Sequence, residues 1–168
     1  MELSPIGSLR QLLTTSPQLV LYSEPAQFSL LIGIARGMAF LHDQKPTPIL
    51  HHDLKSDNVL VWQEGDSAQF IAKIADFGHA TGTLASTMKT NKFGTGAATL
   101  AYKAPEAFDD VFNTASEVYS YGVVGREVLT GEVPWLGYSE ARLTMAIIKE
   151  ERQPLPPDIA AAPLGRMV

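Results

Sequence analysis

The 168-residue sequence contains no cysteine, so disulfides, thiolate metal sites and cysteine nucleophiles are excluded. No apolar run approaches the roughly 18 residues of a membrane-spanning helix, which predicts no membrane segment. The first ten residues lack the charged start and apolar run of a secretory signal. Basic residues number 13 against 18 acidic residues, and no basic run is visible, which argues against nucleic acid as a partner. We therefore expect a cytoplasmic protein.

What the sequence does contain is enough apolar material for a packed core. Hydrophobic residues make up 45% of the chain and charged residues 18%, which is typical of a folded protein and not of a disordered one. The length suits a single domain, and no internal repeat is visible.

Polar groups with complementary chemistry gather in residues 51–78. Asp53 offers a carboxylate that can accept a proton or orient a hydroxyl. Lys55, two residues later, is a cation that can meet a phosphate. Asn58 and Asp76 supply the hard oxygen ligands that Mg²⁺ prefers. These four side chains are the candidate site.

Two runs rich in β-forming residues, 59–62 and 70–75, lie between the two candidate metal ligands. A polar turn over 63–69 joins the runs, so the pattern predicts a β-hairpin. A hairpin brings the chain back on itself, which places Asp76 near Asn58. One carboxylate, one lysine and two metal ligands then converge, an arrangement typical of phosphoryl transfer.

The stretch resembles the catalytic loop, here 51–58, and the metal-binding loop, here 76–78, of the eukaryotic protein kinases. Three further segments extend the resemblance in the same order: Ala104-Pro105-Glu106, residues 117–124 and residues 129–135. The last two are similar to the central helix and following loop of tyrosine-kinase-like kinases. The chain as a whole, 1–168, resembles a partial kinase domain, so we expect a mainly α fold with a small β-hairpin, similar to the kinase C-terminal lobe.

The resemblance assigns roles to the four site residues. Asp53 would orient the substrate hydroxyl and Lys55 would neutralise the transferred phosphate, while Asn58 and Asp76 would hold Mg²⁺. The cofactors implied are ATP and Mg²⁺, and the partner is a protein substrate or another protein. Lysine at position 55 is the serine/threonine pattern. Without Asp53 beside it, Lys55 would be read as a solvated lysine.

Residues 1–8 resemble the kinase hinge, in which Glu2 and Ser4 would present backbone groups to adenine. The alternative is an ordinary N-terminal loop. Leu60 resembles the leucine that lies under the adenine ring, although it also suits the core of a strand. The surface around Leu60 and Ile74 is expected to face the ATP cleft and to be exposed.

Supporting roles follow from the same resemblance. His51 is expected to pack against Phe77, with a metal-binding pair formed by His51 and His52 as the alternative. His52 stands where most kinases have an arginine that pairs with an activation-segment phosphate, which a neutral imidazole would do poorly. Glu117 stands where the family has aspartate holding the catalytic-loop backbone, and its extra methylene would displace that contact. Glu106 closes the activation segment.

The activation segment is expected to span 76–106, with a mobile Thr- and Gly-rich loop. Its end, 99–103, resembles the substrate-side loop and would place Thr99 near Asp53 and Lys55.

Helices are predicted from apolar spacing and caps. Ser8 would cap a short helix that buries its leucines. A second helix is expected over 26–44, with two glycines that permit close packing. A third, over 114–130, would be capped by Thr114 or Ser116 and stopped by Gly131, and a fourth would start at Ser139. We expect C-lobe helices over 9–150 and loop over 151–168. The apolar faces predicted are Leu9, Leu12 and Leu13; Phe28, Leu31, Ile32, Ala35, Met38 and Ala39; and Val118, Tyr121, Val124, Val128 and Leu129.

The 168 residues lack a Gly-x-Gly-x-x-Gly phosphate loop, the strand lysine and the partner glutamate of a complete kinase. The resemblance therefore covers most of a C-lobe, without the N-lobe and the last C-lobe helices. We expect this chain to transfer phosphate very slowly or not at all. The competing hypothesis is an inactive kinase-like scaffold or decoy module.

Overall fold

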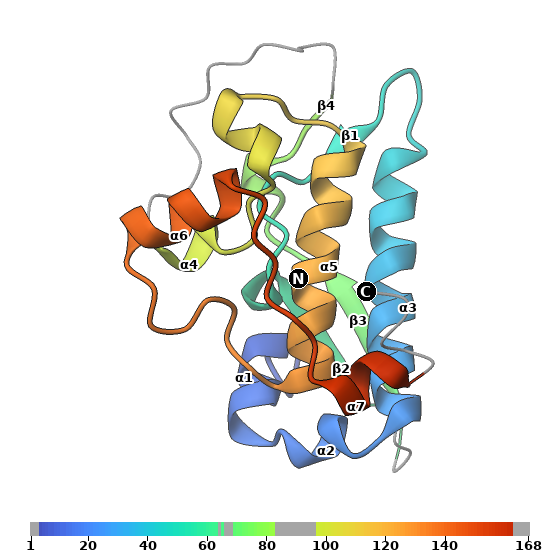
Figure 1. The fold of residues 1–168 in the computed structure, drawn as a ribbon. Helices are drawn as coiled ribbons and strands as arrows, with labels where there is room; N and C mark the ends of the chain where they lie inside the picture. Colours follow the sequence, from blue (N-terminus) through green and yellow to red (C-terminus); the bar gives the residue numbers. More distant parts are fainter. Residues whose placement is uncertain (1–3, 64, 66–68, 83–96, 163–168) are drawn as a thin grey trace.

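The computed structural model describes residues 4–63, 65, 69–82 and 97–162, and the fold is mainly helical with a small β-hairpin, as predicted (Figure 1). The α-helices are α1 (Leu9–Thr15), α2 (Gln18–Leu21), α3 (Glu24–His42), α4 (Ala97–Leu100), α5 (Thr114–Thr130), α6 (Glu140–Ile148) and α7 (Pro157–Ala161). The strands are β1 (Ile49–Leu50), β2 (Val59–Gln63), β3 (Phe70–Ile74) and β4 (Thr81–Gly82), and 3-10 turns occur at η1 (Ser56–Asn58), η2 (Phe77–His79) and η3 (Pro105–Asp109). Among the described residues, no helix is both long and apolar enough to span a bilayer.

Helix α5 runs through the middle of the molecule with α3 beside it, and the β2–β3 hairpin packs against α3 (Figure 1). The hydrophobic core fills the space between these three elements, and α1 and α2 close one end. The site loop between β1 and β2 therefore rests on a buried scaffold.

The buried face of α3 differs from the predicted one. Leu31 and Met38 are buried as expected, but Phe28 is 48% exposed and Ala39 is also exposed. The buried positions are Ala26, Gln27, Leu30, Leu31, Ile34, Met38 and Leu41. Apolar residues occur all round this helix, so spacing alone does not tell the core face from the other.

The two glycines of α3 lie against the hairpin. A Cβ at Gly33 would stand 3.1 Å from the Cβ of Ala72, and one at Gly37 would stand 2.9 Å from the Cδ1 of Ile74. The predicted role of close packing is confirmed.

The hairpin pairs β2 with β3 in antiparallel register, with Val59 opposite Ile74 and Gln63 opposite Phe70. Phe70 and Ala72 are buried, whereas Ile71 and Lys73 are exposed, so one face of β3 meets α3. Ile74 lies on that inner face against Gly37, and both Ile74 and Leu60 are partly buried. The expected exposed apolar surface around these two residues is therefore wrong.

Helix caps follow side-chain chemistry closely. Ser8 and Gln11 form a capping box at the start of α1. The cap of α5 is Asn113 and not Thr114 or Ser116, because Ser116 serves as the reciprocal partner of Asn113 in a second capping box. Ser139 caps α6 as predicted.

Residue 131 ends α5 as predicted, since Gly131 adopts φ 69°, a left-handed conformation that glycine takes without strain. Val118, placed on the buried face from its spacing, is 62% exposed, and the buried side of α5 carries Glu117 and Glu127 instead.

Four short elements, α2, α7, β1 and β4, were not predicted. Helix α7 lies within 151–168, where only loop was expected, and the sequence Pro156-Pro157 precedes and opens it. Helix α2 follows α1 after two residues, and β1 pairs with β4 so that Leu50 lies opposite Thr81. The pairing of β1 with β4 fixes the start of the 76–106 segment beside the site loop.

Candidate active site

The site loop runs from β1 to β2 over residues 51–58 and is anchored at both ends. Leu50 and Val59 flank it and are almost fully buried, and Leu54 within it is 2% exposed. The turn η1 closes the loop, with the Asn58 N–H donating to the carbonyl of Lys55 at 2.9 Å. This compact path directs the polar side chains of the loop toward one another.

Three of the four candidate residues form one cluster. The Lys55 Nζ donates to Asp53 Oδ2 at 2.7 Å, and the Asn58 Nδ2 donates to the same oxygen at 2.9 Å. Asn58 also donates to the backbone carbonyl of Asp53 at 2.8 Å. Asp53 is 9% exposed, and the two donors hold its carboxylate in a single orientation. These contacts leave Oδ1 as the oxygen that can meet a hydroxyl.

Thr99, from α4, joins this cluster although it lies 44 positions after Lys55 in the sequence. Its Oγ1 lies 3.3 Å from the Lys55 Nζ, which donates to it. The predicted neighbourhood of Thr99, Lys55 and Asp53 is present in the structure. Most of the segment before it, 83–96, lies outside the described residues, as does the mobile loop expected there.

Asp76, the fourth candidate, follows directly after β3. The hairpin places the residue before it opposite Asn58, since the Ala75 N–H donates to the Asn58 carbonyl at 2.9 Å. Asp76 adopts φ 62° and ψ 66°, a left-handed conformation uncommon outside glycine, and its Oδ1 accepts the N–H of Gly78 at 3.4 Å. Non-glycine residues in that conformation often mark functional sites.

The donor set around Asn58 and Asp76 fits Mg²⁺. Because the Asn58 amide nitrogen is committed to Asp53, its oxygen is the atom left to face a cation, and the Asp76 carboxylate is exposed. Among the described residues, no group of three or more His, Cys, Asp or Glu could form a metal cage. Two protein oxygens, completed by water and phosphate oxygens, are the usual way in which Mg²⁺ is held.

His51 is fully buried and lies between β3 and the metal loop. Its Nε2 is 2.9 Å from the carbonyl of Ala75, and its ring meets the Phe77 ring edge-on at 5.3 Å between centroids. Phe77 itself is 50% exposed. This geometry matches the packing role expected for His51 rather than a metal-binding pair with His52.

Glu117 reaches the loop in spite of its extra methylene. Its Oε1 accepts the backbone N–H of His52 at 2.6 Å, and its Oε2 lies 2.7 Å from the Nε2 of His42. The expected displacement of this contact is therefore wrong. Glu117 is 4% exposed, and His42, at the end of α3, gives its second oxygen a partner.

His52, on the site loop, contacts residues outside the cluster of Asp53, Lys55 and Asn58. It adopts φ 66°, its Nε2 lies 2.6 Å from the Oγ1 of Thr81, and its ring meets Phe112 edge-on. Burial lowers the pKa of His52 below its usual value, with Glu117 opposing that change and His51 adding to it. The imidazole is thus neutral at pH 7, as expected from the sequence.

The hinge-like stretch lies along β2. Ser4 donates its hydroxyl to the Val61 carbonyl, the Gly7 N–H donates to Ser4 Oγ at 2.9 Å, and the Val61 N–H donates to the Gly7 carbonyl at 3.0 Å. Leu60 pairs with Ser8 in an isolated bridge. Glu2 lies outside the described residues.

Glu106 begins η3, and its carbonyl accepts the N–H of Val111 at 3.2 Å. Burial raises the pKa of Tyr119, while the charge of Arg152 acts in the opposite direction and that of Glu106 adds to the increase.

A second buried network, centred on Glu127, was not predicted from the sequence. Its carboxylate accepts the Tyr102 hydroxyl at 2.6 Å and the Ser56 hydroxyl at 3.2 Å, and pairs with Arg10 Nη1 at 2.7 Å. Glu127 is fully buried. The network joins α1, the site loop, the end of the 76–106 segment and α5. In the sequence, the only indication of it was a charged residue, Glu127, on the apolar face of α5.

Burial raises the pKa of Glu127 to about 7, while the Tyr102 hydroxyl, Arg10 and Ser56 act in the opposite direction. Burial also raises the pKa of Tyr102, and Glu127 adds to that increase. Tyr102 therefore remains a hydrogen-bond donor at neutral pH.

Comparisons with known proteins agree with this geometry. A family model described as protein tyrosine and serine/threonine kinase matches residues 1–167. Over 89% of the chain described here, the sequence is 35% identical to a seven transmembrane domain-containing tyrosine-protein kinase of Dictyostelium discoideum. Over 92% of the chain, it is 35% identical to the serine/threonine-protein kinase CTR1 of Arabidopsis thaliana. It is 42% identical to human mitogen-activated protein kinase kinase kinase 10 over 62% of its length. The chain spans 20%, 18% and 11% of these relatives, respectively.

Proposed function

Because the chain belongs to the protein tyrosine and serine/threonine kinase family, we propose that its site loop supplies the catalytic side of an ATP-dependent transfer to serine or threonine hydroxyls of proteins. The cluster of Asp53, Lys55 and Asn58 carries this proposal, because three side chains with distinct tasks meet at one carboxylate.

Asp53 orients the accepting hydroxyl. Lys55 and Asn58 both donate to its Oδ2, which directs Oδ1 toward the substrate and lowers the freedom of the carboxylate to turn. The substrate hydroxyl donates to Oδ1, and Asp53 takes the proton of the hydroxyl as the hydroxyl oxygen bonds to the γ-phosphorus. The bond between that phosphorus and the β-phosphate oxygen breaks, and ADP leaves. Positioning of this kind contributes more to phosphoryl transfer than covalent chemistry does.

Lys55 stabilises the charge of the transferred group. Its ammonium has three donors, so it can keep its contacts with Asp53 Oδ2 and Thr99 Oγ1, 3.3 Å away, and meet a phosphate oxygen with the third. Thr99 lies on the substrate side, and its contact with Lys55 would link the binding of the protein substrate to the position of the cation.

Asn58 and Asp76 would hold Mg²⁺, and the hard character of their oxygens supports that assignment. When bound, the metal ion would neutralise charge on the ATP phosphates. Ser4 and Leu60 would contact adenine from the β2 side, as would Glu2, and the hydrogen bonds that hold Ser4 and Gly7 along β2 support a fixed position for this stretch.

The rate expected of the 168-residue chain is low, because its sequence has no glycine-rich phosphate loop. Complete protein kinases turn over at about 1–100 per second, and we expect this chain to be far slower. Transfer of labelled phosphate from Mg·ATP to a generic protein substrate, followed under single-turnover conditions, measures it. A rate in the usual range would contradict this expectation.

The substitution Asp53→Asn tests the assignment of the carboxylate. It is expected to lower the residual rate by about 100-fold or more, since general acid–base groups contribute about 10² to 10⁴. Asp57→Asn is the matched control, because Asp57 lies on the same loop with its side chain 51% exposed. Equal rates in the two variants would sink the proposed role of Asp53.

A kinase-like binding module is the second candidate function, favoured by the neutral His52. The two functions differ in their affinity for nucleotide. Selective binding of Mg·ATP raises the melting temperature by mass action, and Asp76→Asn should remove that increase if the site holds the metal. A stable fold with no response to Mg·ATP would favour the binding module.

A further inference from the structure

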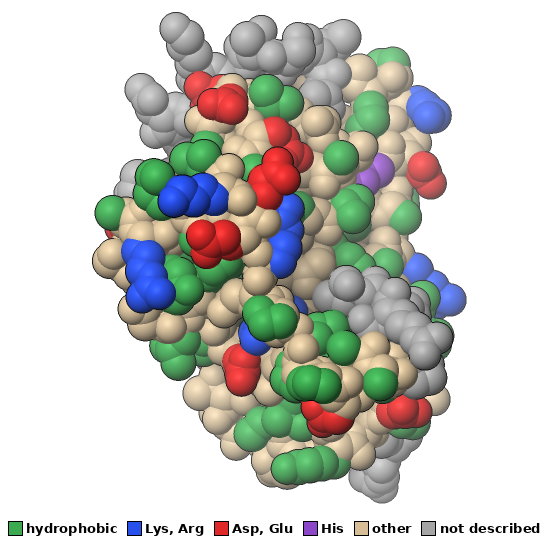
Figure 2. Space-filling view, in the orientation of Figure 1, with side chains coloured by type: hydrophobic (Ala, Val, Ile, Leu, Met, Phe, Trp, Pro, Cys, Tyr) green, Lys and Arg blue, Asp and Glu red, His purple; other side chains and the backbone are tan. Residues whose placement is uncertain are grey.

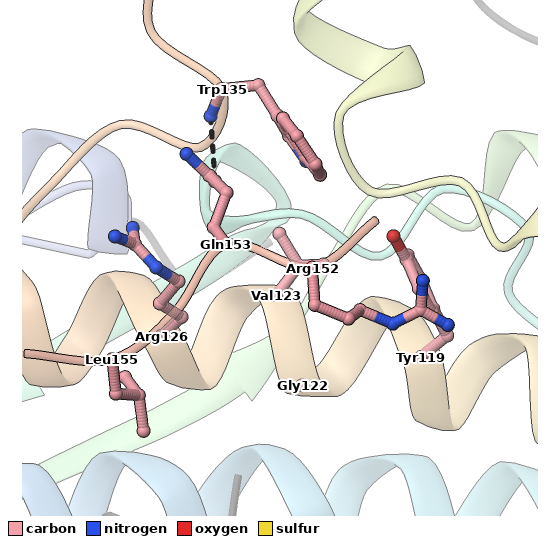
Figure 3. Close-up of a pocket in the computed structure, with 8 residues that line it drawn as sticks. All are labelled: Tyr119, Gly122, Val123, Arg126, Trp135, Arg152, Gln153 and Leu155. Atoms are coloured by element: carbon pink, nitrogen blue, oxygen red, sulfur yellow. Dashed lines mark hydrogen bonds between the residues drawn. The ribbon is translucent and has the colours of Figure 1, made fainter. Parts of the chain in front are cut away.

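A cavity of about 360 Å³ lies on the side of α5 that is turned away from the site loop, outside the cluster described above. Tyr119, Gly122 and Arg126 of α5 line one side of it (Figure 3). Trp135, from the loop before α6, and Arg152, from the stretch before α7, line the other. Its size is within the range of small-molecule sites.

Gly122 makes the floor of the cavity. A Cβ built on this glycine would meet no atom within 4 Å among the described residues. Glycine inside a helix weakens it relative to alanine, so this position keeps a hollow at the expense of helix stability. The space above Gly122 is therefore available to another molecule.

Arg126 presents donors that the described part of the chain does not match. Its side chain is 12% exposed, and its Nη2 pairs with Glu132 Oε2 at 2.6 Å. Its Nε and Nη1 are buried, and no hydrogen-bond acceptor among the described residues meets either of them. Buried donors of a charged group are costly to leave unmatched, so an acceptor that the guanidinium turned to meet would stabilise this end of the cavity.

The other polar groups around the cavity are also donors. The Oε1 of Gln153 accepts the backbone N–H of Trp135 at 2.9 Å, which leaves the amide NH₂ of Gln153 for the cavity. Burial raises the pKa of Tyr119, so its hydroxyl keeps its proton. The guanidinium of Arg152 lies 4.9 Å from the centroid of the Tyr119 ring. Two arginines line the cavity. The acidic groups nearby are Glu132, which is paired with Arg126, and Glu106, whose charge acts on Tyr119. Because the polar groups that line the cavity are donors, it favours a ligand rich in acceptors and negative in charge.

The positions of the two arginines define the orientation of such a ligand. In Figure 3 the guanidinium groups lie at opposite ends of the cavity, on either side of Gly122 and Val123. Arg152 is engaged with an aromatic ring, whereas Arg126 has the unmatched donors. On the face seen in Figure 2, basic and acidic side chains are interspersed, so binding would depend on this cavity and not on a broad positive surface.

We propose that this cavity binds a small organic anion, with its carboxylate or phosphate at Arg126 and its apolar body over Gly122 and Val123. Leu155 and Trp135 supply the apolar walls that such a body needs. The site is separate from the proposed phosphoryl transfer, and neither proposal depends on the other.

Phenyl phosphate is a suitable probe, and benzyl alcohol is its neutral counterpart. In the ¹⁵N-labelled 168-residue chain, phenyl phosphate at up to about 10 mM should shift the Gly122 amide and the Trp135 indole signals, since weak small-ligand sites saturate in the millimolar range. Benzyl alcohol should bind at least about tenfold more weakly, because it lacks the charge that Arg126 selects.

Two variants locate the site. Gly122→Leu fills the floor and should abolish the shifts, and Arg126→Gln should weaken binding about tenfold, the loss of one charge-assisted contact. Arg126→Lys keeps the charge beside Glu132 and should fall between Arg126→Gln and the native chain. Arg142→Gln is the matched control, because Arg142 is exposed on α6 and also lies over a tyrosine ring, that of Tyr138. A single cooperative thermal transition confirms that each variant is folded.

Three results would overturn the proposal. Equal binding of benzyl alcohol would make the cavity an apolar hollow without anion selectivity. Shifts that survive Gly122→Leu, or that Arg142→Gln removes equally, would place the anion on the surface. The absence of any shift at about 10 mM would mean that water alone satisfies Arg126.

Discussion

Substitution of alanine for Gly33 tests the contact between α3 and the hairpin that carries Asp76. A Cβ at this position would stand 3.1 Å from the Cβ of Ala72 and 3.3 Å from both its backbone N and its backbone O. These atoms belong to β3, where the ladder to β2 holds them in place. Gly122→Ala is the matched control, because Gly122 is also inside a long helix and has open space at the same point.

The magnitude follows from two opposing effects. Alanine gains about 1 kcal/mol over glycine in a helix interior, and both variants receive that gain. At Gly33 the new methyl lies closer than the roughly 3.5–4.0 Å at which carbon atoms pack best. Overpacking of this kind costs about 1–3 kcal/mol. Gly33→Ala should therefore be destabilised by about 1 kcal/mol, and Gly122→Ala stabilised by about the same amount.

Urea unfolding of the two variants and of the native chain measures the difference. A gap of about 2 kcal/mol separates the midpoints by about 1 M, given slopes of about 1–3 kcal/mol per molar urea. If Gly33→Ala were as stable as Gly122→Ala, α3 would not lie in tight contact with β3. The close packing described for this face would then be refuted.

Three further perturbations concern hydrogen bonds and charge. The Glu127 carboxyl binds its proton more tightly in the folded state than in the unfolded chain. The free energy of unfolding should therefore fall by about 3 kcal/mol as the pH rises from 4.5 to about 7. Urea titrations at pH 5 and pH 8 measure this dependence, and Glu127→Gln should remove most of it. Glu117→Ala leaves the N–H of His52 and the ring of His42 without their acceptor and should cost about 2 kcal/mol in thermal unfolding, whereas Glu117→Gln should retain the contact with His52. Ser8→Ala removes the capping box of α1 and should cost about 1 kcal/mol by urea unfolding, and a loss below a few tenths would contradict the cap.

The elements that could be predicted from the sequence are those whose signals are local. The hairpin, the ends of α5 and the caps at Ser8 and Ser139 depend on turn residues, β-rich runs and hydroxyls within a few positions of one another. The neighbourhood of Asp53, Lys55 and Asn58 was predictable for the same reason, because η1 needs only a short turn.

The buried faces were less predictable. The apolar residues Phe28 and Val118 match a helical period but are exposed, while Gln27 and Glu127 are buried. A helix with apolar residues on several sides does not reveal which side its neighbours cover. That choice depends on packing between elements far apart in the sequence, such as α3 against β3.

The polar networks were hidden for a related reason. Glu127 binds Tyr102 and Ser56, which lie 25 and 71 positions away in the sequence. Such a network appears only once α1, the site loop and α5 are placed in space. The contact between Glu117 and the His52 N–H shows the same limit. The longer side chain of glutamate predicted that this contact would be displaced, but the path of the backbone brings the two groups within 2.6 Å.

Helix α5 sets the span of the site loop, since Glu117 holds it at His52 and Glu127 holds it at Ser56. The two glutamates are ten positions apart, which fixes them about 15 Å from one another along the helix axis. One residue inserted between them would turn Glu127 by about 100° and separate it from Arg10 and Ser56. The rigid helix thus fixes the distance between the two points at which it holds the loop, His52 and Ser56. Length changes in this chain should be tolerated in the turn between β2 and β3 and not between residues 117 and 127.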